Sequence, residues 1–267
     1  MSHLPGKFVW FEHSSSHIPK ARKFYDPLFN WHTEAMPMGE RRYHMIMNGD
    51  AGIGGYRVGA EGARSHWIAY LSVDDVDAAY REAVLAGARP IERPADFGPV
   101  GRGASIADPT GATLSLWRST EGDRPDADQT PAGDWYWNEL WTPDTIGALA
   151  FYQRVFGYTH ETMEMGAQGT YYVLKKDGVA RAGMMRSTEP RAPAMWLPYV
   201  AVDDCDATAD KARRLGGQVL SGPSDVPGVG RFAVLADPLG AAIAVIRPAP
   251  AVGAMTDAAA IDEATAA

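Results

Sequence analysis

One segment of the chain combines aromatic side chains with an acid in a pattern that could form a reactive or ligand-binding site. Residues 134–141 read DWYWNELW. Alternate side chains of a β-strand point to the same face, so Trp135, Trp137, Glu139 and Trp141 are expected together. An unpaired charge among indoles is costly or becomes protonated, so Glu139 needs a partner, a raised pKa or a cavity. In a cavity it would orient a ligand or act as a general acid or base.

The same arrangement occurs near the start of the chain. FVWFEH places Trp10 and Glu12 two residues apart, as Trp137 and Glu139 are. Glu12 and Glu139 are therefore the candidate catalytic residues, with aromatic walls to hold a small flat ligand. Two alternatives stay open: the tryptophans belong to the core, and Glu139 pairs with an arginine. The candidate ligand-binding residues are Trp10, Trp135, Trp137, Trp141, Tyr199, Arg102 and Arg231.

The paired acids belong to an internal duplication. Phe24-Tyr25 recurs as Phe151-Tyr152 at the spacing that separates Glu12 from Glu139. Three further motifs, VDD, GR and DP-x-G, also recur in the same order. Such self-similarity predicts two copies of one structural unit. The predicted organisation is a first module over 1–121, a linker over 122–133 rich in Pro, Gly and Asp, a second module over 134–249 and a flexible tail over 250–267.

Each copy shows strands and helices in a fixed order. An alternating strand precedes a segment with apolar residues at helical spacing, and further strands follow. WIAYLSV and WLPYVAV then run into Asp-Asp pairs, which are typical helix N-caps. Two closing strands are joined by the Asp-Pro-x-Gly turn. The pattern predicts an α+β fold in which helices cover only one face of each sheet.

Composition excludes several kinds of partner. The 267 residues are 46% hydrophobic and 22% charged, with a formal net charge of -8, which argues against nucleic-acid binding. No apolar run approaches the length of a membrane span or a signal peptide. Cys205 is the only cysteine in the sequence, so no intrachain disulfide forms. These features predict a cytoplasmic protein that does not contact membrane.

The ordered motifs resemble the vicinal oxygen chelate superfamily, which includes glyoxalases, bleomycin resistance proteins and extradiol dioxygenases. The resemblance rests on the strand ending in an acid, the FY helix, V-DD-x-DA, G-R and DP-x-G, each present twice. It implies a tandem pair of βαβββ-type modules, whose curled mixed sheets form cups, with any active site inside a cup. It also implies a divalent metal bound by His and Glu.

The expected metal ligands are mostly missing. The family's first-strand ligand matches Glu12 and Glu139, but its histidine position falls on Ile68 and Leu197. Its final-strand carboxylate falls on Ser115 and, in the second copy, on alanine. One carboxylate in each module does not provide the three or more ligands that a divalent ion prefers. The sequence therefore predicts no cofactor, with a divalent metal as the alternative.

Two functions are consistent with these patterns. The chain binds a small aromatic or oxygenated organic molecule in aromatic-lined cups, with lyase, isomerase or oxygenase chemistry at Glu12 or Glu139. Alternatively, it is a non-enzymatic protein that sequesters a small molecule without metal. Because one chain carries both modules, a monomer suffices and a homodimer is an option.

Overall fold

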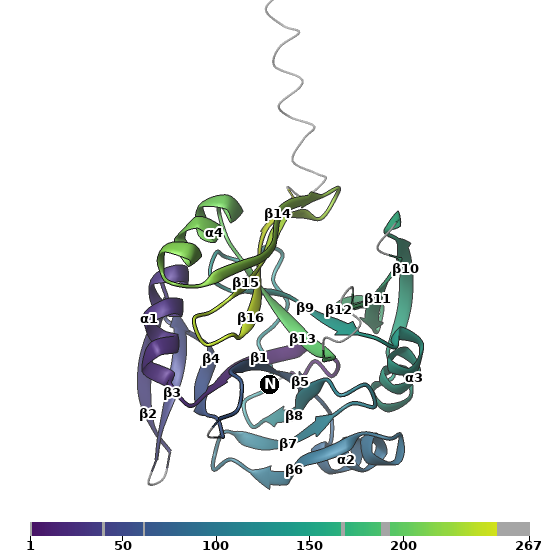
Figure 1. The fold of residues 1–267 in the computed structure, drawn as a ribbon. Coiled ribbons are helices and arrows are strands. Elements are labelled where there is room, and N and C mark those ends of the chain that lie inside the picture. The colour runs from purple at the N-terminus through teal and green to yellow at the C-terminus, as the bar shows by residue number, and fades with distance from the viewer. Residues whose placement is uncertain (1, 39–40, 61, 167–168, 188–192, 250–267) are drawn as a thin grey trace, which may run out of the picture.

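The chain forms two eight-stranded mixed sheets, one from each copy of the repeat (Figure 1). The computed structural model describes residues 2–38, 41–60, 62–166, 169–187 and 193–249, so the predicted tail over 250–267 lies outside the described residues. The predicted α+β class and the tandem pair of modules are confirmed.

The two sheets have the same strand order. The first runs β2 (His32–Met38), β3 (Arg41–Asn48), β4 (Ala51–Val58), β1 (Phe8–Ser15), β5 (His66–Ser72), β8 (Thr113–Ser119), β7 (Gly101–Ala107), β6 (Arg89–Asp96). The second runs β10 (Thr159–Glu164), β11 (Thr170–Lys176), β12 (Val179–Arg186), β9 (Trp135–Thr142), β13 (Met195–Ala201), β16 (Ala242–Pro248), β15 (Gly230–Ala236), β14 (Gln218–Val226). The central pairs, β1 with β5 and β9 with β13, are antiparallel. Each sheet thus consists of two βαβββ halves joined at their first strands.

One helix follows the first strand of each half. The helices are α1 (Ile18–Phe29), α2 (Val76–Leu85), α3 (Thr145–Phe156) and α4 (Cys205–Arg214). Asp75 and Asp204 cap α2 and α4 by accepting hydrogen bonds from backbone N–H groups, as predicted. Gly157 ends α3 in the left-handed conformation, with φ of 66°. Over the described ranges, no helix combines the length and apolarity that crossing a bilayer requires.

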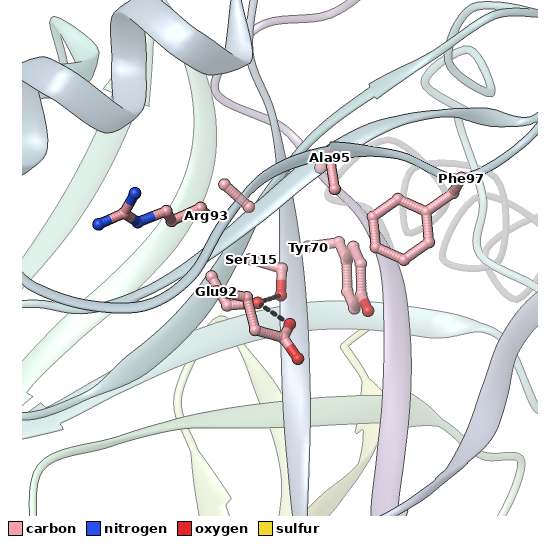
Figure 2. Close-up of a pocket in the computed structure, with 9 residues that line it drawn as sticks. Tyr70, Glu92, Arg93, Ala95, Phe97 and Ser115 are labelled. Carbon is pink, nitrogen blue, oxygen red and sulfur yellow. Dashed lines mark hydrogen bonds between the residues drawn. The ribbon is translucent and has the colours of Figure 1, made fainter.

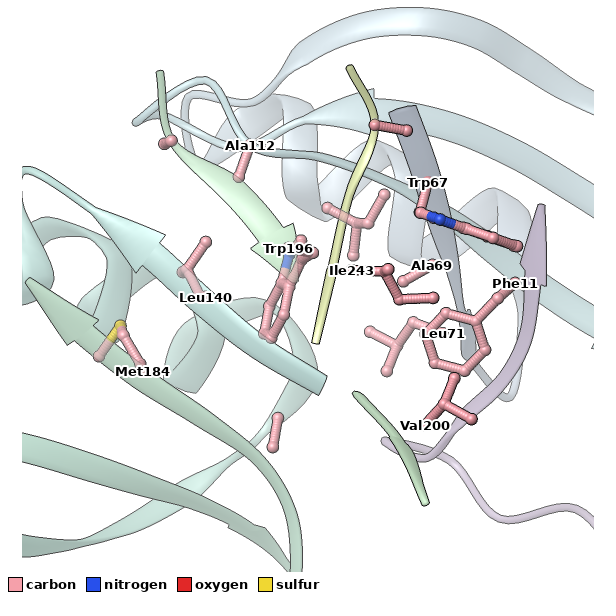
Figure 3. Close-up of a cluster of buried hydrophobic side chains, with 14 of the residues drawn as sticks. Phe11, Trp67, Ala69, Leu71, Ala112, Leu140, Met184, Trp196, Val200 and Ile243 are labelled. Carbon is pink, nitrogen blue, oxygen red and sulfur yellow. The ribbon is translucent and has the colours of Figure 1, made fainter. Parts of the chain in front are cut away.

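A large hydrophobic core shared by both modules joins them. It contains buried side chains from both sheets and from all four helices. Figure 3 shows Phe11 and Leu71 of the first sheet in the same cluster as Leu140 and Trp196 of the second. Helix α1 packs beside α4, and α2 packs beside α3, so each module covers the other. Each large apolar side chain that is fully buried contributes about 1.5–3 kcal/mol. The helix-bearing faces of the two sheets are therefore buried together.

Buried polar contacts also cross from one module to the other. The Tyr152 hydroxyl on α3 donates to Asp108 in the β7–β8 turn, with an O–O distance of 2.8 Å. In the other direction, Nε2 of His13 on β1 lies 2.8 Å from the Asp237 carboxylate in the β15–β16 turn. Trp31 donates its indole N–H to the backbone carbonyl of Gly133. These contacts fix the two modules to each other at defined points.

The inner face of each sheet, opposite the helices, carries the paired acids. Phe11 and His13 lie in the shared core region, so Glu12 between them points to the inner face. Glu139 is placed in the same way, next to the core residue Leu140. We call the inner face of the first sheet the first cup and that of the second sheet the second cup.

The expectation that Trp135 shares the face of Glu139 is wrong. A β-bulge interrupts the pairing of β9 with β13, because Trp137 pairs with Tyr199 whereas Trp135 pairs with the next residue, Val200. The extra residue in β9 turns Trp135 to the opposite face. Its ring lies 4.3 Å from that of Phe11, in the core between the modules. Trp135 is therefore a core residue and not a wall of the cup.

Candidate functional site

Glu12 lies at the centre of a hydrogen-bonded network in the first cup. The Tyr43 hydroxyl donates to Oε1 at 2.7 Å, and the Tyr70 hydroxyl donates to Oε2 at 2.5 Å. The Trp10 indole N–H donates to the Tyr43 oxygen at 2.9 Å. Arg57 on β4 places Nη1 3.9 Å from Oε2. The partners of this acid are thus two tyrosines, with an arginine at the edge.

A cavity of about 260 Å³ adjoins Tyr70 in the first cup (Figure 2). The residues that line it belong to β5, β6, β7 and β8, except Phe97, which directly follows β6. They are Tyr70, Glu92, Arg93, Ala95, Phe97, Gly103, Ala104, Ser105 and Ser115. One side is polar, because the Ser105 hydroxyl lies 2.9 Å from that of Ser115 and donates to Glu92 at 2.8 Å. The other side is aromatic, with Tyr70 and Phe97. The cavity is large enough for a single ring with substituents.

The ionisable groups of the first cup have pKa values that fix their roles as donors and acceptors. The hydrogen bond from Arg57, 2.8 Å away, holds the pKa of Glu92 below its usual value. Burial, and then the charge of Glu12, raise the pKa of both Tyr43 and Tyr70 well above 10. At neutral pH, Glu92 is therefore an ionised acceptor, and both phenols keep their protons.

The second cup repeats the floor of the first. Trp141 donates its indole N–H to Oε1 of Glu139 at 2.5 Å, and the Tyr199 hydroxyl donates to the same oxygen at 3.0 Å. Trp137 donates to the Tyr171 hydroxyl, as Trp10 does to Tyr43. Burial raises the pKa of Glu139, while the bonds from Trp141, Tyr171 and Tyr199 act in the opposite direction. The raised pKa expected for this acid is present.

The walls of the second cup are apolar where those of the first are polar. Strand pairing defines the equivalent positions, because each set meets the same neighbours in register. Gly103, Ser105, Ser115 and Arg57 of the first cup correspond to Phe232, Val234, Ala244 and Met185 of the second. Leu197, Tyr199, Val234, Ala244 and Ile246 form a separate buried cluster there. The second cup is thus packed with side chains at positions where the first has its cavity.

The residues on the cup floors do not fit a divalent metal. Beside Glu12, the cross-strand neighbour is Ile68, and beside Glu139 it is Leu197. Both oxygens of Glu12 already accept tyrosine hydrogen bonds. Within the described part of the chain, no three His, Cys, Asp or Glu side chains come together. Protein sites for divalent ions use at least three such ligands, so neither cup supplies the donor set.

The two predicted ligand-binding arginines point away from the cups and toward acids of the helices and edge strands. Arg102 pairs with Asp77 of α2 and with Asp96, and Arg231 pairs with Asp206 of α4 and Asp225. On β7, alternate residues Gly103 and Ser105 face the cavity, so Arg102 points to the helix-bearing side. The arginines therefore form partly exposed ion pairs on the helix-bearing side, away from the cavity, and their predicted role in ligand binding stays a prediction.

The remaining predicted residues lie in the cups, and the sequence interpretation missed three important ones. Trp10, Trp137, Trp141 and Tyr199 all take part in the hydrogen-bonded networks around the acids. The missed residues are Glu92 and Ser105, which belong to the polar wall of the first cup, and Arg57, which donates to Glu92. A comparison of GRGAS with GRFAV, at residues 101–105 and 230–234, carries the signal that could have revealed the open cavity.

Comparisons with known proteins agree with the architecture. The chain is 41% identical over 247 residues to "Putative glyoxylase CFP32" of Mycobacterium tuberculosis (strain CDC 1551 / Oshkosh), covering 90% of this chain and 94% of that protein. It is 29% identical over 270 residues to "Anthracycline biosynthesis protein DauV" of Streptomyces sp. (strain C5), covering 95% of this chain and 97% of the relative.

Solved structures share the fold at low identity. The Mn(II)-bound glyoxalase from Novosphingobium aromaticivorans superposes with a TM-score of 0.65 at 16% identity, covering 92% of this chain and 83% of the other. A variant of homoprotocatechuate 2,3-dioxygenase from B. fuscum gives a TM-score of 0.65 at 14% identity, covering 97% of this chain and 76% of the other.

A family model completes the assignment. The model described as Glyoxalase/Bleomycin resistance protein/Dioxygenase superfamily matches residues 7–116 and 137–245. These two matches coincide with the two sheets and their helices. The chain therefore belongs to the glyoxalase/bleomycin resistance protein/dioxygenase superfamily, with one domain of that family in each module.

Proposed function

We propose that the chain binds a small organic molecule in the first cup and does so without a protein-bound divalent metal. The observation that carries this proposal is the cavity of about 260 Å³ between the polar residues Glu92, Ser105 and Ser115 and the rings of Tyr70 and Phe97. Concave sites with apolar walls and a few fixed polar groups are typical of small-molecule binding. The relatives named for a glyoxylase and for anthracycline biosynthesis also point to small organic molecules.

The proposal assigns separate roles to the floor and the wall of the first cup. Glu12 is held by two phenol donors and is buried, so it fixes the positions of Tyr43 and Tyr70. Tyr70 then presents its ring to the cavity, while Glu92 and the two serines provide the polar contacts. Trp10 extends the aromatic surface next to Tyr43. Affinity comes from the rings and orientation comes from the polar wall.

A binding screen combined with metal analysis tests this proposal. The purified protein is assayed for divalent metal and then screened against small ring compounds by NMR, with indole N–H signals as reporters. We expect binding to shift the signals of Trp10, which donates to Tyr43, and of Trp117 on β8, whose ring lies 5.9 Å from that of Tyr70. Binding should also survive treatment with EDTA. Near-stoichiometric metal whose removal abolishes binding would contradict the metal-free site. Shifts confined to Trp137 and Trp141 would place the ligand in the second cup.

A catalytic role is the second candidate, and one contact favours it. The Tyr70 hydroxyl lies 2.5 Å from Glu12, close enough for a proton to move between them when a ligand contacts the phenol oxygen. This geometry suits a lyase or an isomerase in which Glu12 and Tyr70 act as base and acid. A compound found in the screen that is converted to product by the wild type, but not by Tyr70→Phe, would establish this role.

The proposal also covers the oligomeric state and the cellular location of the protein. One chain buries both helix-bearing faces in a shared core, so a monomer suffices for a complete first cup. A homodimer is compatible with this arrangement. The predicted cytoplasmic location stays a prediction, and sedimentation at several concentrations determines the oligomeric state.

A further inference from the structure

The first cup carries an uneven set of charges around its cavity. Glu12 and Glu92 are two carboxylates, and Arg57 lies between them, 3.9 Å from the first and 2.8 Å from the second. The strong bond to Glu92 already engages the Arg57 guanidinium. Arg93 also borders the cavity, but its guanidinium points away from the other lining side chains (Figure 2). Among the groups that these contacts join, two carboxylates and one guanidinium therefore leave one negative charge.

The polar wall also offers more hydrogen-bond acceptors than hydrogen-bond donors. The Glu92 side chain is 45% exposed and, as an ionised carboxylate, can only accept hydrogen bonds. Ser105 donates its proton to Glu92, so Ser115 donates to the Ser105 oxygen, and neither hydroxyl keeps a free proton for a ligand. The opposite wall is aromatic: the Trp117 ring lies 5.9 Å from Tyr70 and 5.7 Å from Phe97. A ligand must match acceptors on one side and rings on the other.

We infer that the first cup selects a ring compound that carries N–H or O–H donors and no negative charge, with an amine preferred over a neutral alcohol. This inference rests on the proposed function and specifies its ligand class. A cationic amine gains from the carboxylate of Glu92 and from the faces of the surrounding rings. A carboxylate ligand would lose its hydration opposite Glu92 without gaining a free cationic partner, because Arg57 is already paired.

Three probes with the same phenol ring test the charge rule. They are 4-hydroxybenzylamine, 4-hydroxybenzyl alcohol and 4-hydroxybenzoate, whose substituents are cationic, neutral and anionic at pH 7. We expect NMR titrations to give the affinity order amine, alcohol, benzoate, with at least tenfold between the first and the last. Equal or tighter binding of the benzoate would overturn the inference.

Charge variants assign the selectivity to named residues. Glu92→Gln removes the negative charge of the wall, so the preference for the amine over the benzoate should fall at least tenfold. Arg57→Met copies the second cup and leaves the carboxylates unneutralised, so the same ratio should rise. Arg93→Gln is the matched control, because its guanidinium points away, and the ratio should stay within twofold of the wild-type value. An unchanged ratio in Glu92→Gln would contradict the inference.

A cavity-filling variant separates this inference from the proposed function. If Gly103→Phe abolishes binding of every probe that the wild type binds, the cup is the site, and the order of affinities alone decides the charge rule. If the probes bind equally well to Gly103→Phe, or none binds the wild type, both the site and the charge rule fail. Should Gly103→Phe not fold, the double variant Ser105→Val/Ser115→Ala removes the hydroxyls of the polar wall without filling it, and it should weaken all three probes.

Discussion

The floors of the two cups carry matching side chains, whereas their walls differ. Each floor has a glutamate, two tyrosines and a tryptophan that donates to one of them. The walls replace Gly103 with Phe232 and Ser105 with Val234; the cavity of about 260 Å³ lies in the first cup, and buried apolar side chains occupy the corresponding positions of the second. A shared floor thus supports the sheet in both modules, whereas the walls decide whether a ligand has room. An acid at the centre of a cup is therefore weaker evidence for chemistry than open space beside it.

Exchanging one wall residue between the cups should have the largest effect. Gly103→Phe places a ring where Phe232 lies in the second cup and fills the cavity, so binding in the first cup should weaken roughly a hundredfold, about 2.7 kcal/mol. An added Cβ at Gly103 would lie 2.9 Å from the Trp117 ring, so this ring must shift to admit the side chain. Isothermal titration measures the loss, and circular dichroism checks the fold. Wild-type affinity in this variant would show that the wall does not distinguish the cups.

The junctions between the modules offer a second contrast. His13 pairs with Asp237, whereas the residue equivalent to His13 is Leu140, and Asp108 relies on Tyr152. His13→Leu should cost about 2 kcal/mol in the free energy of unfolding, because Asp237 loses a buried partner but keeps two backbone N–H bonds. Urea denaturation measures this loss. No loss would mean that the two junctions are equivalent in stability.

The stability that the His13–Asp237 pair contributes should decrease as the pH falls. Burial by itself raises the pKa of Asp237, but the hydrogen bond and charge of His13 bring it below 3.8. A lowered pKa in the folded state contributes stability above 3.8 that is lost as the pH falls through the folded value. His13→Leu should therefore reduce the loss of stability that acidification below 3.8 causes, and urea denaturation at a series of pH values measures this change. A loss as steep as that of the wild type would contradict the role of His13.

Neutralising the two floor acids should change stability in opposite directions. Burial raises the pKa of Glu139 from 4.5, so its contribution is fully present below 4.5 and is lost as the pH rises through the folded value. Glu139→Gln should therefore raise the unfolding free energy at pH 7, because the amide has no charge to desolvate; urea denaturation measures the change. Glu12→Gln should lower it by about 1 kcal/mol, because charge-assisted bonds from two phenols and the attraction of Arg57 are weakened. Changes of the same sign would remove this distinction between the floors.

The surface arginines should show the smallest effects, and these should be equal. Arg102 and Arg231 make the same pair of contacts in the two modules, each to a first-turn helix acid and to an edge-strand acid. Such exposed ion pairs contribute little. Arg102→Ala and Arg231→Ala should leave the urea midpoint and probe binding within experimental error. A loss of binding in Arg102→Ala alone would reopen its role as a ligand-binding residue.

The internal sequence repeat made the two-module fold predictable. The alternation of side chains along a strand placed Glu12 and Glu139 on the correct face of each sheet. Both signals are local or repeat along the chain, so one sequence carries them. The position of Trp135 was not predictable in this way, because a bulge depends on how β9 pairs with β13. Arg57 and Glu92 were missed because they come from strands that are far from Glu12 in sequence and have no characteristic spacing to it. Only the folded sheet brings the three together.

The contacts of Asp108 with Tyr152 and of Asp237 with His13 have a consequence for how such a chain can be divided. Each repeat leaves a carboxylate in its closing turn whose partner belongs to the other repeat. A fragment cut between 122 and 133 would bury that acid alone or expose the surrounding apolar surface to water. Because neither half of such a cut keeps the partner of its own closing-turn acid, we expect the two repeats to fold as one unit and not as separable domains.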